Sequence, residues 1–88
     1  MPTYSLSIKR SASKSLRGIP KNRREKIKAS IHALVEAPRP PGCKKLSKKK
    51  PLYRIHVGKY RVIYEIRDKE LIVLVVVIDH RSKAYRKK

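Results

Sequence analysis

The segment LYRIHVGKYRVIYEI predicts a β-hairpin with a defined register. Two strand-like runs are separated by Gly58-Lys59, and a two-residue loop with glycine first suits a tight hairpin turn. If Val57 pairs with Tyr60, then His56 lies opposite Arg61, and side chains alternate between the two faces of the strands. The face expected to pack on helices carries Tyr53, Ile55, Val57, Tyr60, Val62 and Tyr64. The other face carries Arg54, His56, Arg61 and Glu65, which explains why cations interrupt an apolar hairpin.

Two helices are predicted ahead of this hairpin. Ser11 is placed to cap a short helix that runs through Leu16 and ends at Gly18. A second helix opens at Ile19-Pro20, because proline fits the first helical turn, and it stops near Ala37, before a proline-rich segment. Its apolar positions recur at helical spacing and form one stripe, made of Ile27, Ile31, Leu34 and Val35.

Four strands complete the prediction, at residues 3–8, 52–57, 60–67 and 70–78. The last three follow one another through tight turns and form an antiparallel meander. The run LIVLVVVI in the last strand is apolar at every position, so we expect that strand to be central and covered on both faces. The fold class is therefore α+β: a strand, a two-helix hairpin and a three-stranded meander, with the helices on one face of the sheet.

Charge is the strongest compositional signal. The 88 residues, expected to form one domain over residues 1–88, hold 25 Lys and Arg against 6 Asp and Glu, a net charge of +19. Such a surface attracts polyanions. The longest apolar run has eight residues, whereas a membrane-spanning helix needs about 20, and the amino terminus lacks the pattern of a secretory signal. Cys43 is the single cysteine, so no intrachain disulfide is expected and a cytoplasmic location is predicted.

The order of the meander brings cations to one edge of the sheet. The hairpin turn and the end of the last strand lie at the same edge, so His56, Arg61 and Arg81 are expected to converge. Two arginines could hold the non-bridging oxygens of a phosphodiester during attack by the ribose 2′-OH. His56 or His80 could exchange protons near neutral pH, and Tyr85 could stack on a base.

Structural roles for the same residues remain open alternatives. Arg61 could pair with Glu65 or Asp79. The histidines could be structural, and the tyrosine near the carboxyl terminus could pack on the sheet.

The segment PGCKKLSKKKP is predicted to be a basic loop that contacts RNA or the ribosome through its lysines, unless it is only a solvated loop. The residues expected to make these contacts, with the lysine of the hairpin turn, are Lys44, Lys45, Lys48, Lys49, Lys50 and Lys59. Metal and cofactor sites are not expected. The acids are spread through the chain, and one cysteine with three histidines gives no zinc spacing.

The segments YRIHVGKYRVIYEI and IDHRSKAY, in this order of elements, resemble the RelE family of toxins within the RelE/ParE superfamily. The resemblance covers nearly the whole chain. It implies a toxin of a type II toxin–antitoxin pair that cuts messenger RNA in the ribosomal A site without metal and is silenced by an acidic, RelB-like antitoxin in a hetero-oligomer. Family site positions would fall on Arg61, Arg81 and Tyr85, with Arg54 and His56 standing where the best-known pattern has lysines.

Two other functions remain open at this point. ParE-type relatives share the fold and inhibit DNA gyrase as binding modules instead of cutting RNA. A plain RNA-binding domain without activity would show binding that weakens steeply with salt and no cleaved product.

Overall fold

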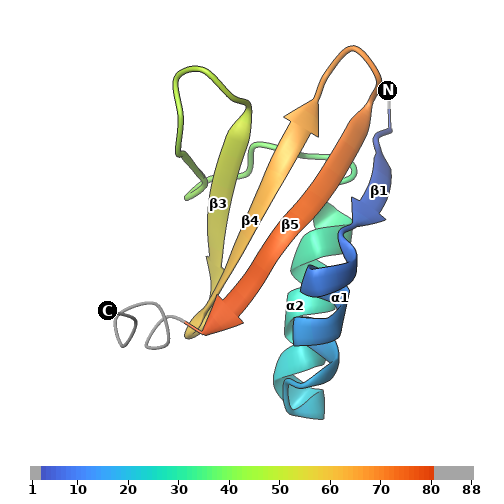
Figure 1. The fold of residues 1–88 in the computed structure, drawn as a ribbon, viewed down its shortest axis with the longest axis vertical. Helices are drawn as coiled ribbons and strands as arrows, with labels where there is room; N and C mark the ends of the chain where they lie inside the picture. Colours follow the sequence, from blue (N-terminus) through green and yellow to red (C-terminus); the bar gives the residue numbers. More distant parts are fainter. Residues whose placement is uncertain (1–2, 81–88) are drawn as a thin grey trace.

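The computed structural model describes residues 3–80. Their elements, in chain order, are β1 (Ser5–Ile8), α1 (Arg10–Arg17), α2 (Lys21–Ala33), β2 (Lys44–Lys45), β3 (Leu52–Val57), β4 (Tyr60–Arg67) and β5 (Ile72–His80). Both helices pack against one face of a twisted sheet (Figure 1). This confirms the predicted α+β class. Neither helix in this part of the chain is long and apolar enough to cross a membrane.

The sheet has five strands in the order β1-β5-β4-β3-β2. The meander β3-β4-β5 is antiparallel as predicted, and β1 runs parallel to β5 at one edge. A parallel neighbour requires a crossover, and α1 and α2 supply it. The short strand β2 was predicted as part of a loop, but Lys44 and Lys45 pair with Arg54 and Tyr53 on β3.

Both helices differ from the prediction at their ends. The chain enters α1 at Arg10, one residue before Ser11, and Lys9 occupies the N-cap position with extended backbone and no side-chain cap. The prediction that Ser11 caps α1 is therefore wrong, because the main-chain carbonyl of Lys9 already accepts a bond from the Ser13 N–H. The second helix ends at Ala33, before the predicted end near Ala37. The turn that follows uses i→i−3 bonds, such as Leu34 N–H to Ile31 O at 3.0 Å.

The β3–β4 hairpin has the predicted register at every pair from Val57↔Tyr60 to Tyr53↔Tyr64. Gly58 has φ +62°, and Lys59 does not share the positive φ. This combination is typical of the type II′ turn, which matches the twist of the flanking strands. The tight turn allows only this alignment, so each side chain of the hairpin is assigned to one face.

The core lies between the helices and the inner face of the sheet. Ile27, Ile31 and Leu34 form the buried stripe of α2 and its C-cap, and each is at most 1% exposed. Val62 and Tyr64 of β4 face them and are fully buried. Full burial of a side chain of this size contributes about 1.5–3 kcal/mol, so these residues contribute substantially to the stability of the described chain.

The prediction that β5 is covered on both faces is wrong for the described residues. Val73 and Val75 are buried in the core, but Ile72, Leu74 and Val77 are only partly buried, on the face without helices. The register of β5 shifts between Ile63 and Tyr64 of β4, so that one residue of β5 is left without a partner. The strand nonetheless lies between β1 and β4, as its apolar character suggests.

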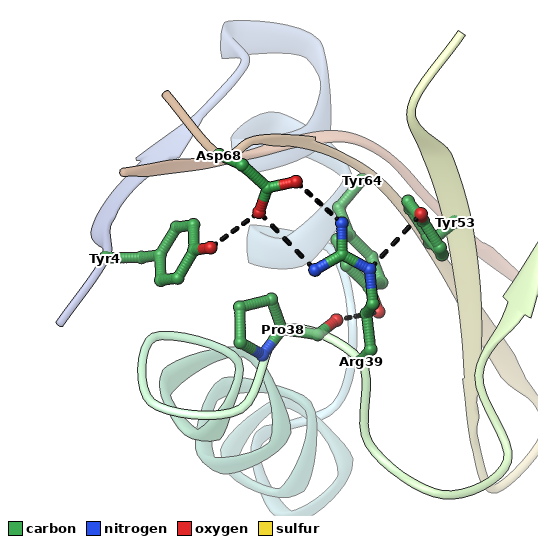
Figure 2. A network of polar contacts seen from close by, with 6 residues as sticks. All are labelled: Tyr4, Pro38, Arg39, Tyr53, Tyr64 and Asp68. Atoms are coloured by element: carbon green, nitrogen blue, oxygen red, sulfur yellow. Dashed lines mark hydrogen bonds and ion pairs between the residues drawn. The ribbon is translucent and has the colours of Figure 1, made fainter. Parts of the chain in front are cut away.

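A polar cluster closes the end of the fold farthest from the β3–β4 turn (Figure 2). Arg39, after α2, donates two hydrogen bonds to the carboxylate of Asp68, with Nη2–Oδ2 at 2.8 Å and Nη1–Oδ1 at 3.4 Å, and its Nε donates to the Tyr53 hydroxyl. Tyr4 donates to Asp68 at 2.6 Å, and Tyr64 donates to the carbonyl of Pro38 at 2.7 Å. The cluster fastens the segment after α2 to β1 and β4.

Replacing Tyr64 by phenylalanine should lower the free energy of unfolding by about 1–2 kcal/mol, because the Pro38 carbonyl loses its donor while the ring stays buried. Burial raises the pKa of Tyr64, so the hydroxyl keeps its proton as a donor at neutral pH. Denaturant unfolding followed by circular dichroism measures the change. Tyr60→Phe is the control, expected within about 0.5 kcal/mol of wild type, and equal losses in both variants would contradict the assignment.

Asp68 should make stability depend on pH in acid. Hydrogen bonds from Arg39 and then from Tyr4 lower the pKa of this carboxyl. A depressed folded-state pKa stabilises the fold above the unfolded pKa of about 3.9, and that stability is lost as the pH falls through the folded value. Because the pair is half exposed, Asp68→Asn should cost only about 0.2–1 kcal/mol at neutral pH and should flatten the decline below pH ~4. Unfolding curves for both proteins across this range test it.

Candidate functional site

The face of the sheet without helices carries the cations predicted from the hairpin. Arg54 and His56 on β3 lie opposite Ile63 and Arg61 on β4. His56 is exposed, whereas Arg54 and Arg61 are partly buried. Lys44 of β2 lies opposite Arg54 and extends the same row, since directly paired residues share a face. We call this surface, made of Lys44, Arg54, His56 and Arg61 with Asp79, the open face.

Arg61 forms an ion pair with an acidic side chain of the neighbouring strand. Its Nε and Nη2 each donate to one carboxylate oxygen of Asp79 at 2.9 Å, and the two residues are direct partners across β4 and β5. The side chains are 25% and 26% exposed, so the pair lies at the surface and is accessible from solvent. The structural ion pair considered for Arg61 is therefore present, with Asp79 as the acid. Glu65, the other candidate, pairs with Arg67 at 3.0 Å.

An irregularity in β5 directs Asp79 to the open face. Tyr64 pairs with Val75 and Ile63 pairs with Val77, so Val76 is the extra residue of a β-bulge. Val73 and Val75 face the core before the bulge, and Ile78 faces it afterwards. The alternation thus changes by one, which turns the next residue toward Arg61. With uninterrupted alternation, Asp79 would lie on the helix side of the sheet.

The same bulge separates the two candidate histidines. His80 is the partner of Tyr60, and the rings meet edge to face with centroids 5.0 Å apart. Tyr60 lies on the face that packs on the helices, opposite to His56. Within the described chain, His56 is the histidine that stands beside Arg61, and His80 belongs to the other side of the sheet.

Arg54 has an unusual environment. Its Nε is buried and has no hydrogen-bond partner among residues 3–80. A buried donor without a partner is costly, and such groups are concentrated at functional sites. The observation marks the centre of the open face, between Lys44 and His56, as a place where an acceptor from outside residues 3–80 would be favourable.

The remaining basic residues do not all converge on Arg61. Lys48, Lys49 and Lys50 are exposed in the loop that precedes β3, where the main-chain N–H groups of the last two donate to the Ser47 hydroxyl at 3.2 Å. That loop is at the opposite end of β3 from the hairpin turn (Figure 1). A strand of six residues spans about 20 Å, so these lysines form a separate patch. Lys59 is exposed in the turn itself.

Two predicted site residues, Arg81 and Tyr85, lie outside the described residues. Within residues 3–80, no group of three or more His, Cys, Asp or Glu side chains is placed to hold a metal ion. The described part of the site is therefore the row of cations on β2, β3 and β4 and the carboxylate on β5.

Comparison with known proteins identifies the family. Residues 6–85 match the family model described as the ParE toxin of the type II toxin–antitoxin system parDE. The chain belongs to this family. Within the RelE/ParE superfamily, its solved relatives place it with the RelE toxins, as the sequence resemblance implied.

Three relatives illustrate the match. The chain is 28% identical over 86 residues to RelE1 of Methanocaldococcus jannaschii, which covers 94% of this chain and 96% of the relative. It superposes with a TM-score of 0.82 and 27% identity on the RelE–RelB complex of Pyrococcus horikoshii, over 92% of this chain and 98% of that one. The Escherichia coli RelBE complex gives a TM-score of 0.77 and 26% identity, over 88% and 95% of the two chains.

The pairing of Arg61 with Asp79 can be measured by a double-mutant cycle. Arg61→Gln and Asp79→Asn should each destabilise the fold by about 1 kcal/mol, because each leaves a partly buried polar group without its partner. The double variant should cost little more than either single change, which corresponds to a coupling energy of about 0.5–1 kcal/mol for a surface pair with bidentate geometry. Denaturant unfolding of the four proteins gives the coupling. Strictly additive losses would show that the ion pair does not form in solution.

Proposed function

We propose that this RelE-family toxin is a ribosome-dependent endoribonuclease that cuts messenger RNA in the ribosomal A site and thereby inhibits translation. The observation that supports this most directly is the open face itself. A hairpin whose other side is buried presents Arg54, His56 and Arg61 in adjacent register positions. Arg81 follows His80, the last residue of the strand that contributes Asp79.

The reaction requires no metal. The ribose 2′-OH attacks the adjacent phosphorus, the bond to the 5′-oxygen breaks, and a 2′,3′-cyclic phosphate or its 3′-phosphate hydrolysis product remains. Arg61 and Arg81 stabilise the extra negative charge of the phosphorane, since a planar guanidinium can bind two oxygens at once. In this proposal His56 would exchange the proton, and Tyr85 would contact the base or the phosphate. Arg54 would add positive charge beside these groups, and its Nε has no hydrogen-bond partner among residues 3–80.

The ion pair between Arg61 and Asp79 would contribute to a requirement for the ribosome. The carboxylate holds the edge of the Arg61 guanidinium, so a phosphodiester must approach in an orientation that this geometry permits. Free RNA rarely presents its 2′-OH and its leaving oxygen in line, and few polar groups on the open face could impose that arrangement. A ribosome that holds the messenger RNA in place would supply the missing alignment, and free RNA should be cut poorly.

The partners follow from charge and from the relatives. RelE proteins of Pyrococcus horikoshii and Escherichia coli form complexes with RelB antitoxins. A chain of net charge +19 would favour an acidic companion, so we propose a RelB-like antitoxin in a hetero-oligomer. The lysines before β3 and in the hairpin turn would contact ribosomal RNA at separate places; they are Lys44, Lys45, Lys48, Lys49, Lys50 and Lys59. Action on translating ribosomes would place the protein in the cytoplasm.

Inhibition of DNA gyrase is the second candidate. The specific observation in its favour is that the matching family model is described as the ParE toxin of parDE. In that case the open face would be a docking surface, and Arg61 would be a structural residue held by Asp79.

Arg81→Ala should reduce cleavage on programmed ribosomes by about 100-fold or more, the usual effect of removing a transition-state donor. Primer extension that maps the 5′ ends of the messenger RNA measures it, with pelleting to verify ribosome binding. Arg10→Ala is the matched control, since Arg10 is an exposed arginine on α1, and it should cleave like wild type.

Cleavage at the wild-type rate by Arg81→Ala, with binding intact, would remove Arg81 from the mechanism. A supercoiling assay with the same wild-type preparation separates the candidates. Loss of supercoiling together with intact messenger RNA would favour gyrase inhibition over the nuclease.

A further inference from the structure

A basic hollow lies on the helix side of the hairpin turn, across the sheet from the open face. It has a volume of about 310 Å³ and lies between the amino-terminal half of α2 and the β3–β4 turn. Its lining residues are Asn22, Arg23 and Lys26 from α2, and Val57, Gly58, Lys59 and Tyr60 from the hairpin. We call this site the turn hollow. Two elements far apart in the sequence thus contribute cations to one concave surface.

The cations of the turn hollow are not neutralised by the described part of the protein. Arg23, Lys26 and Lys59 are exposed, no acid lines the hollow, and within residues 3–80 their side chains form no ion pair. Elsewhere within residues 3–80, four acids form ion pairs, and each pairs with an arginine of the sheet or of the segment after α2. These acids are Glu65, Asp68, Glu70 and Asp79. Within residues 3–80 the turn hollow is therefore a site of uncompensated positive potential, which attracts anions.

The floor of the turn hollow is apolar. Val57 and Tyr60 form the closing pair of the hairpin, and both are half-buried against the core. A phosphodiester chain combines charged oxygens with a largely apolar sugar and base, so cations above an apolar floor suit it. Single-stranded nucleic acids are generally bound in this way, with a basic groove that follows the backbone and aromatic side chains beneath the bases.

The turn hollow and the open face meet at the tip of one hairpin. Tyr60 lines the turn hollow, while its neighbour Arg61 points to the other face, and the exposed turn Gly58-Lys59 separates the two. We infer that the turn hollow binds a backbone phosphate of RNA while the scissile phosphate lies on the open face. This inference rests on the proposed nuclease function and extends it by a second phosphate site. RNA is favoured over an acidic protein because only the short turn Gly58-Lys59 separates the two surfaces, so one polyanionic chain can contact both.

Two matched triple variants test the inference. One changes the cations of the turn hollow, Arg23→Gln, Lys26→Gln and Lys59→Gln. The control changes exposed cations that do not line it, Arg10→Gln, Lys28→Gln and Lys69→Gln. Each set lowers the net charge of +19 by three, so the general electrostatic effect is matched. Because all six side chains are exposed, unfolding free energies should stay near wild type, and denaturant unfolding verifies this.

The first measurement uses a fluorescent RNA oligonucleotide with 2′-O-methyl riboses, which cannot be cut, and anisotropy over a series of KCl concentrations. For single strands, each phosphate contact contributes about 0.7 to the slope of log K against log salt. The triple change in the turn hollow should reduce the slope by about 0.7, as expected for the loss of one phosphate contact, and the control triple by clearly less. Equal changes in both would mean that only net charge matters and would overturn the inference.

The second measurement is cleavage on programmed ribosomes. The triple change in the turn hollow should raise KM by about tenfold and leave kcat intact, since it removes binding that is equal in the ground and transition states. A raised KM with an unchanged oligonucleotide slope would assign the phosphate to ribosomal RNA, and changes in both would assign it to the messenger strand. No change in either would overturn the inference.

Polyglutamate binding provides the remaining comparison. If the triple change in the turn hollow abolished binding of this acidic polymer but left RNA binding and KM unaltered, the hollow would be a protein-docking site and the inference would be wrong. If the wild-type protein failed to cut messenger RNA while the slope still fell by about 0.7, the nuclease proposal would fail and the phosphate site would stand.

Discussion

The register of the β3–β4 hairpin is the constraint on which the rest of the molecule depends. The turn at Gly58 allows one alignment, and that alignment buries Tyr53, Ile55, Val62 and Tyr64 against the helices. A slip by one residue would put Arg61 into the core and tyrosines into solvent, at a cost of several buried side chains. The hydrophobic core therefore maintains the row of cations on the open face. The same pair of strands supplies core side chains on one face and the cations of the open face on the other.

The β-bulge at Val76 adds a second constraint that the hairpin alone does not supply. It lets β5 keep Val73, Val75 and Ile78 in the core and still turn Asp79 toward Arg61 and His80 toward Tyr60 at its end. Bulges occur preferentially near functional sites because they redirect a side chain without breaking the sheet. In this molecule the redirected residue determines how the guanidinium of Arg61 is held.

The hairpin, the meander and the helical stripe were predictable from the sequence because each has a clear local pattern: glycine in the turn, alternation on the strands and helical spacing on α2. The bulge was not predictable, since a run of valines has no alternation that could show a shift. The sequence also gave no sign of β2, because Lys44 and Lys45 join the sheet only through pairing with β3. The turn hollow was missed because Arg23 and Lys26 read as ordinary solvated residues of a helix until the hairpin is placed beside them.

Within residues 3–80, ion pairs are distributed unevenly between the two ends of the sheet. At the end away from the hairpin turn, Arg39 and Arg67 pair with Asp68, Glu65 and Glu70, although Lys48, Lys49 and Lys50 are exposed there. At the other end, Lys59 and the cations of α2 have no acid beside them in the turn hollow. Mutual repulsion there destabilises the free protein, and any polyanion that binds the folded state relieves it and adds stability by mass action. An acidic antitoxin or an RNA that bound at this end would relieve the same repulsion, so we expect the two to compete there.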